Sequence, residues 1–134
     1  MGKKSLVISS FMSKDMEFAG RFLLKELQKQ RLAIDAAMWF FYPEMSTWKY
    51  ILVMDDFEEK GPAFLYNIIS QINRNHKSSR YHEIPLDMVE AKGKSSFIYK
   101  VMRSVISLDS GEMRFTNNMV NGLEIADCLI YRMK

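Results

Sequence analysis

Acidic and basic side chains with the spacing of a catalytic metal site occur in two segments of this sequence. Glu90 and Lys92 are separated by one residue in a predicted strand, and Asp55 and Asp56 end an earlier apolar run. Residues two apart in a strand point to the same face, so Glu90 and Lys92 share a face. If the two strands are parallel neighbours, the aspartates lie at the same edge of the sheet, where carboxylates could hold a divalent cation.

The Glu90-x-Lys92 pattern resembles the corresponding corner of the PD-(D/E)xK nucleases. The resemblance implies that Asp55 or Asp56 binds Mg²⁺ together with Glu90, and that Lys92 orients or activates the attacking water. In that family the aspartate and the E-x-K strand are usually adjacent antiparallel strands, whereas a whole predicted helix separates them here. We therefore treat a Mg²⁺-dependent nuclease as the alternative to a plain polar strand end.

A second candidate site lies in the basic segment "RNHKSSRYHE". Its Arg74, Lys77, Arg80 and Tyr81 combine cations, which bind phosphates, with a ring on which a base can stack. The same composition is typical of a solvated loop. Residues 1–31 and 71–103 each carry seven Lys or Arg against three acids, so a fold that brings them together predicts nucleic acid as a partner.

Aromatic residues form a third set, which points to an interaction surface. Trp39, Phe41 and Trp48 lie in two neighbouring apolar runs and exceed what one small core is expected to cover. An exposed aromatic row is a binding patch, and symmetric pairing of two chains is the commonest way to cover it. We therefore expect an interface at these residues, with a second copy of the chain or another protein as partner.

The sequence indicates no metal and no cofactor. The single cysteine, Cys128, excludes an intramolecular disulfide, and the two histidines complete no cluster with zinc-ligand spacing. The longest apolar run is far shorter than the roughly 20 residues that span a bilayer. We expect a cytoplasmic protein in a reducing compartment, without membrane contact and without enzymatic activity.

Length and composition predict one domain. The chain has 134 residues, of which 48% are hydrophobic, enough for a core without disulfides. No repeat or linker marks a boundary, so residues 1–134 form a single predicted α+β domain.

The first half of the chain predicts a helix, a hairpin and a second helix. Apolar residues recur at helical spacing from a cap at Ser13 or Asp15 to about Arg31. Aromatic and β-branched runs at 35–42 and 48–55 predict a β-hairpin, and the first run is apolar on both faces, as in a central strand. Pro62 suits the first position of the next helix.

The second half predicts three strands and one further helix. These are a strand at 84–90, a helix at 95–106 capped by Ser95, and two closing strands joined at Asn121-Gly122 by a type I′ turn. The predicted fold is a five-stranded mixed sheet with three helices in the order α-β-β-α-β-α-β-β. Strands 48–55 and 84–90 are joined through a helix, so they should be parallel if they are neighbours.

Three longer segments resemble a group of small bacterial proteins of unassigned function: "LAIDAAMWFFYPEMSTWKYILV", "EEKGPAFLYNII" and "NGLEIADCLIYRM". The resemblance spans nearly the whole chain and implies no active site, cofactor or substrate. Taken together, the sequence predicts a non-enzymatic binding or interaction module that forms a homodimer. The alternative is a nucleic-acid-binding protein or a Mg²⁺-dependent nuclease.

Overall fold

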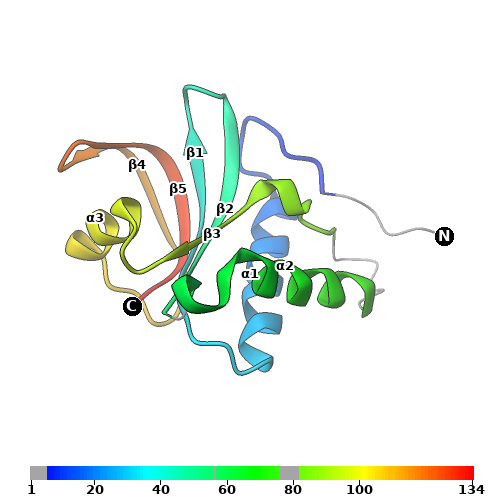
Figure 1. The fold of residues 1–134 in the computed structure, drawn as a ribbon. Coiled ribbons are helices and arrows are strands. Elements are labelled where there is room, and N and C mark those ends of the chain that lie inside the picture. Colours follow the sequence, from blue (N-terminus) through cyan, green and yellow to red (C-terminus); the bar gives the residue numbers. More distant parts are fainter. Residues whose placement is uncertain (1–5, 56, 76–81) are drawn as a thin grey trace.

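A computed structural model describes residues 6–55, 57–75 and 82–134. Within these residues the elements follow one another in the predicted order (Figure 1). They are α1 (Lys14–Lys29), β1 (Ile34–Tyr42), β2 (Thr47–Met54), α2 (Phe57–Asn75), β3 (Val89–Gly93), α3 (Phe97–Val105), β4 (Met113–Val120) and β5 (Leu123–Met133). The strands form one mixed sheet in the spatial order β3-β2-β1-β5-β4, which confirms the α+β prediction.

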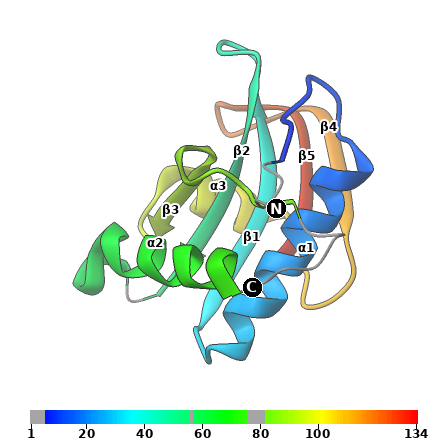
Figure 2. The ribbon, with the colours of Figure 1, turned by 90° about the vertical axis from the view of Figure 1, so that its right-hand side faces the viewer.

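The sheet is covered on both faces. Helices α1 and α2 pack on one face and α3 packs on the other (Figures 1 and 2). The central strand β1 supplies Ala37 and Trp39 to the first core and Ala36 and Met38 to the second, and all four are fully buried. This confirms β1 as a central strand that is apolar on both faces because both faces are buried.

Strand pairing follows the predicted directions. β1 and β2 form an antiparallel hairpin, and β2 pairs in parallel with β3, from Tyr50 opposite Val89 to Met54 opposite Gly93. The closing hairpin turns at Asn121 (φ 48°) and Gly122 (φ 86°). Two successive positive φ angles are those of a type I′ turn, so this prediction is confirmed.

Two predicted boundaries are wrong. Residues 84–88 are not part of a strand: Pro85 has no N–H to pair, and a short 3₁₀ turn, Leu86–Met88, follows it, closed by the Met88 N–H donating to the Pro85 carbonyl at 2.9 Å. Glu90 is therefore in the body of β3 and not at its end. Helix α3 is preceded by Ser96, not Ser95, as its N-cap residue.

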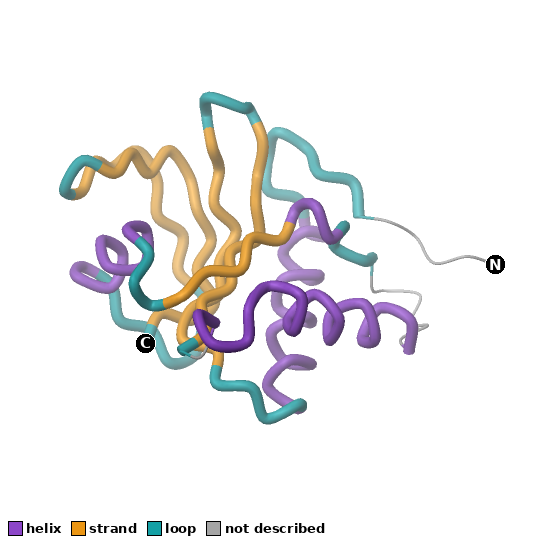
Figure 3. Tube along the Cα trace, viewed as in Figure 1, coloured by secondary structure: helices purple, strands orange, loops and turns teal. Residues whose placement is uncertain are grey.

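Helix α2 is interrupted near its start. Gly61 has φ 77° and ψ 171°, which no helix contains, and Pro62 follows this break as the first residue of the longer helical part. Figure 3 shows the bend in the path of α2. Pro62 is suited to that position because its missing N–H has no partner in a first turn. No helix in the described part of the chain is long and apolar enough to cross a membrane.

Helix α1 is attached to the sheet by three aromatic side chains that donate hydrogen bonds to its backbone carbonyls. The bonds are Trp39 Nε1 to Met16 O at 2.9 Å, Tyr131 Oη to Glu17 O at 2.8 Å, and Tyr50 Oη to Gly20 O at 2.7 Å. Buried Trp and Tyr need a partner for their polar atoms, and here the second lone pairs of helix carbonyls supply it.

Gly20 allows this close approach. A Cβ atom at this position would lie 2.5 Å from the Tyr131 hydroxyl oxygen and 2.7 Å from Trp39 Nε1. Both neighbouring rings are buried and hydrogen-bonded, so neither can move away without losing a contact. Position 20 therefore requires glycine, because any side chain would collide with these rings.

We expect Gly20→Ala to destabilise the protein. Replacing a helical glycine with alanine ordinarily stabilises by about 0.5–1 kcal/mol, but overpacking a well-packed core costs about 1–3 kcal/mol, so the sign should reverse. Urea unfolding measures the difference. Lys25→Ala, on the exposed face of the same helix, is the control and should change stability by less than about 0.5 kcal/mol. A Gly20→Ala variant as stable as the wild type would contradict the packing role.

Candidate functional site

The aromatic row predicted to form an interface lies inside the protein. Trp39 and Trp48 are 0% and 1% exposed, and Phe41 packs half-buried against Trp48 with 5.3 Å between ring centroids. Trp48 Nε1 also donates to the Ser10 carbonyl at 3.4 Å. The prediction that this row is exposed is wrong, because α1 and the segment before it cover the rings. Self-association itself stays a prediction.

The carboxylates predicted for a nuclease site are not brought together. In the parallel register Glu90 is opposite Ile51, four residues before Asp55. At about 3.3 Å per residue this separates the two positions by about 13 Å along the sheet. Glu90 accepts a hydrogen bond from the Tyr42 hydroxyl at 3.0 Å instead. Burial, and then the charge of Glu90, raise the pKa of Tyr42.

The other members of the predicted nuclease site do not complete it. Lys92 is opposite Val53 in β2, and Asp55 forms an ion pair with Lys94 at 3.8 Å. Asp56 lies outside the described residues. Among the residues that the structure describes, no group of three or more His, Cys, Asp or Glu side chains is arranged to hold a metal ion.

Most of the predicted basic loop lies outside the described residues. Arg74 is exposed in the last turn of α2, while Lys77, Arg80 and Tyr81 lie outside the described residues. The nucleic-acid site at this loop therefore stays a prediction.

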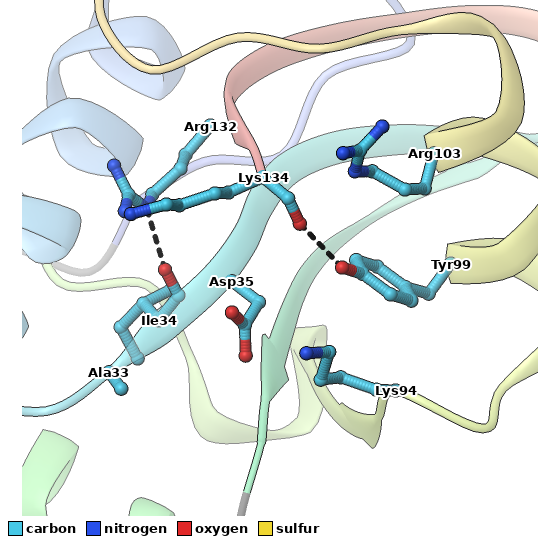
Figure 4. Close-up of a pocket in the computed structure, with 8 residues that line it drawn as sticks. All are labelled: Ala33, Ile34, Asp35, Lys94, Tyr99, Arg103, Arg132 and Lys134. Carbon is cyan, nitrogen blue, oxygen red and sulfur yellow. Dashed lines mark hydrogen bonds between the residues drawn. The ribbon is translucent and has the colours of Figure 1, made fainter.

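A different cationic site lies at one end of the sheet, beside α3. It is a shallow pocket of about 380 Å³ lined by Ala33, Ile34, Asp35, Lys94, Tyr99, Arg103, Arg132 and Lys134 (Figure 4). These residues come from the start of β1, the end of β3, helix α3 and the end of β5. Four of the eight are cations and one is a carboxylate, so the site has the composition of an anion-binding pocket.

A β-bulge turns Asp35 toward this pocket. Ile34 is opposite Met54 and Ala36 is opposite Val53, so Asp35 is an extra residue in β1 without a partner of its own in β2. Bulges bend a strand and redirect a side chain, and they are common beside functional sites. The Asp35 carboxylate consequently lies among the cations, and the Lys94 amine points toward it (Figure 4).

A second irregularity shapes the β5 side of the pocket. Ala37 is opposite Arg132 and Met38 is opposite Ile130, which leaves Tyr131 as the extra residue of β5. Arg132 Nε then donates to the Ile34 carbonyl at 2.6 Å.

The end of β5 is tied to β1 and to α3. The Lys134 N–H donates to the Asp35 carbonyl at 2.8 Å, and the Tyr99 hydroxyl donates to the Lys134 carbonyl. The Asp35 backbone is thus held by the end of β5.

The Asp35 carboxylate has an unsatisfied atom. Its Oδ2 is buried and has no hydrogen-bond partner. Burial raises the pKa of Asp35, and the charge of Asp55 adds to this, while Lys94 and Arg132 act in the opposite direction. A charged carboxylate with a buried oxygen that lacks a hydrogen-bond partner lowers the stability of the folded protein. Residues that lower stability in this way are common at functional sites.

The cations of the pocket are accessible. Arg103 and Lys134 are exposed, and the Lys94 side chain is 45% exposed. Arg103 forms no hydrogen bond or ion pair with the part of the chain that the structure describes. Like charges gathered in one place repel one another, and a bound anion would relieve that repulsion.

No protein-family model, curated protein or solved structure matches this chain. The pocket residues are also those that sequence reasoning missed. One signal was present: Asp35 is the only charged residue in the apolar run 32–42. The other pocket residues gave no signal, because they are scattered through the sequence and meet only in the folded sheet.

Cys128 offers no nucleophile at neutral pH. The thiol is fully buried in β5, and burial, followed by the charge of Asp127, raises its pKa to about 12. Catalysis by cysteine requires the thiolate, which this environment disfavours.

We expect Asp35→Asn to stabilise the protein at neutral pH. The pKa of Asp35 is higher in the folded than in the unfolded state, so the wild type loses stability as the pH rises through these two values. The advantage of the variant should therefore be full at pH 7 and vanish below the ordinary pKa of aspartate, about 3.9.

Urea unfolding at pH 7 and pH 3 measures this difference. Glu124→Gln, at an exposed position of β5, is the control and should have little effect at either pH. If the wild type is the more stable protein at pH 7, the carboxylate makes a favourable contact and is not a cost.

Proposed function

We propose that this protein is a non-enzymatic binding module whose ligand carries a phosphate group. The observation that supports it is the convergence of Lys94, Arg103, Arg132 and Lys134 on one pocket. These cations come from three separate parts of the fold, so their meeting is not a consequence of sequence proximity. The proposal also keeps three expectations from the sequence: a homodimer, a cytoplasmic location and a bacterial source. The homodimer no longer has the support of an exposed aromatic row, because Trp39 and Trp48 are buried.

The chemistry of the pocket favours phosphate among anions. Arginine presents a planar fork of N–H donors that matches phosphate oxygens, and lysine adds a mobile point charge. The pocket also lies beyond the carboxyl ends of the parallel strands β2 and β3, and Lys94 directly follows β3. Ligands of sheets with parallel strands commonly bind at that end.

Binding without catalysis is favoured by the positions of the reactive groups. The predicted nuclease carboxylates Asp55 and Glu90 are engaged with Lys94 and Tyr42, at different levels of the sheet. The thiol of Cys128 is buried, and burial raises its pKa, which disfavours the thiolate. None of these groups faces the cationic pocket as one of its lining residues.

A nucleic-acid backbone is the second candidate, because it offers the same phosphate chemistry. Arg132 also lines a neighbouring depression together with Arg21 and Lys25 of α1, so cations continue from the pocket onto the helix. Arg21 is already paired with Glu112, however, which weakens this continuation. A small phosphate ligand in the pocket is therefore favoured over a nucleic-acid backbone.

We expect Arg103→Gln to weaken the binding of inorganic pyrophosphate by about tenfold, the equivalent of one lost charged hydrogen bond. Isothermal titration calorimetry at low ionic strength measures the dissociation constant. Lys100→Gln is the matched control: it removes the same charge from an exposed position of the same helix but does not line the pocket, and affinity should be unchanged.

Labelled single-stranded oligonucleotides are titrated in parallel to separate the two candidates. Affinity that rises with oligonucleotide length and depends on Lys25 would favour the nucleic-acid backbone. If no phosphate compound binds saturably at low salt, the proposed function is wrong.

A further inference from the structure

One group in the pocket is not explained by a phosphate ligand. Asp35 places a carboxylate among four cations, where it repels a bound phosphate. A purely structural carboxylate would be paired with those cations. Yet Asp35 forms no ion pair within the described residues, and its Oδ2 has no hydrogen-bond partner.

We infer that the ligand is a small hydroxylated phosphate monoester, such as a sugar phosphate, whose phosphate contacts the cations and whose hydroxyl donates to Asp35. This inference rests on the proposed function and names its ligand class. Carboxylates accept hydrogen bonds from sugar hydroxyls with high strength because the acceptor is charged. The volume of about 380 Å³ is within the usual range of small-molecule sites.

A hydroxyl suits this position better than an amine. An ammonium group would also bind a carboxylate, but Lys94, Arg132 and Lys134 act electrostatically on Asp35 and would repel it. A neutral donor satisfies the carboxylate without that repulsion.

The surroundings hold Asp35 ready for such a contact. The bulge in β1 turns its side chain toward the pocket, and the hydrogen bond from the Lys134 N–H at 2.8 Å holds its carbonyl. Tyr99, only 6% exposed, forms a rigid wall through its hydrogen bond to the Lys134 carbonyl. A carboxylate that is already positioned loses little conformational freedom when it binds a ligand.

The test compares inorganic phosphate with ribose 5-phosphate by calorimetry, on the wild type and on Asp35→Ala. We define the preference ratio as the dissociation constant of phosphate divided by that of ribose 5-phosphate. A hydrogen bond to a charged group predicts a ratio above about ten for the wild type. In Asp35→Ala the ratio should fall to about one, while phosphate binds as tightly as before or more tightly, since a repelling charge is gone.

Asp55→Ala is the control for charge alone. Asp55 acts electrostatically on Asp35 and pairs with Lys94 but does not line the pocket. Its removal should therefore tighten the binding of both ligands by a similar factor and keep the preference ratio of the wild type. Thermal unfolding checks that both variants are folded. A ratio of one in the wild type, or an unchanged ratio in Asp35→Ala, would overturn the inference and leave the proposed function standing.

Two further outcomes also decide the matter. Ethanolamine phosphate binding more tightly than ribose 5-phosphate would show that Asp35 receives an amine, and oligonucleotides binding more tightly would show that the ligand is a strand. Either result overturns the ligand class. If inorganic phosphate and ribose 5-phosphate both fail to bind, the proposed function itself is wrong.

Discussion

The attachment of α1 to the centre of the sheet is the constraint on which the rest of the structure depends. Three buried rings, Trp39, Tyr50 and Tyr131, donate hydrogen bonds to carbonyls of one helix, and Gly20 leaves room for them. These contacts satisfy the polar atoms of the rings while removing a large apolar surface from water. They explain how these three rings are buried between one helix and the sheet.

The same attachment is connected to the cationic pocket through β5. Tyr131 is the extra residue of a bulge, and its hydroxyl reaches the helix. Arg132 and Lys134 follow at the end of the same strand. Arg132 Nε donates to the Ile34 carbonyl, and the Lys134 N–H donates to the Asp35 carbonyl. One short segment therefore supports both the core and the pocket. The register shift at Tyr131 is followed directly by Arg132, whose Nε reaches the Ile34 carbonyl beside the pocket.

The sequence predicts the helices, strands and turns better than it predicts which residues come together in the folded protein. The helical spacing of α1, the apolar faces of β1 and the Asn121-Gly122 turn are local patterns, and the structure confirms them. The strand proposed for 84–90 was half wrong, because a turn after Pro85 delays pairing until Val89. The difference matters for function, because Glu90 lies in the body of β3, opposite Ile51 and away from Asp55.

Neither the pocket nor the burial of the aromatic row follows from local patterns. The pocket depends on the parallel register of β2 and β3 and on two bulges, which single residues do not reveal. In the aromatic row, Trp39 Nε1 donates to the Met16 carbonyl of α1 and Trp48 Nε1 donates to the Ser10 carbonyl before that helix, and composition does not reveal these acceptors.

The most direct measurement is a two-dimensional ¹H–¹⁵N NMR titration of the labelled protein with ribose 5-phosphate. A phosphate-binding pocket at the sheet end predicts saturable shifts of backbone amides at residues 33–35, 94–103 and 132–134, with the amides near Glu90 and along α2 unaffected. Shifts that spread over other surfaces, or no shifts at millimolar ligand, would contradict it.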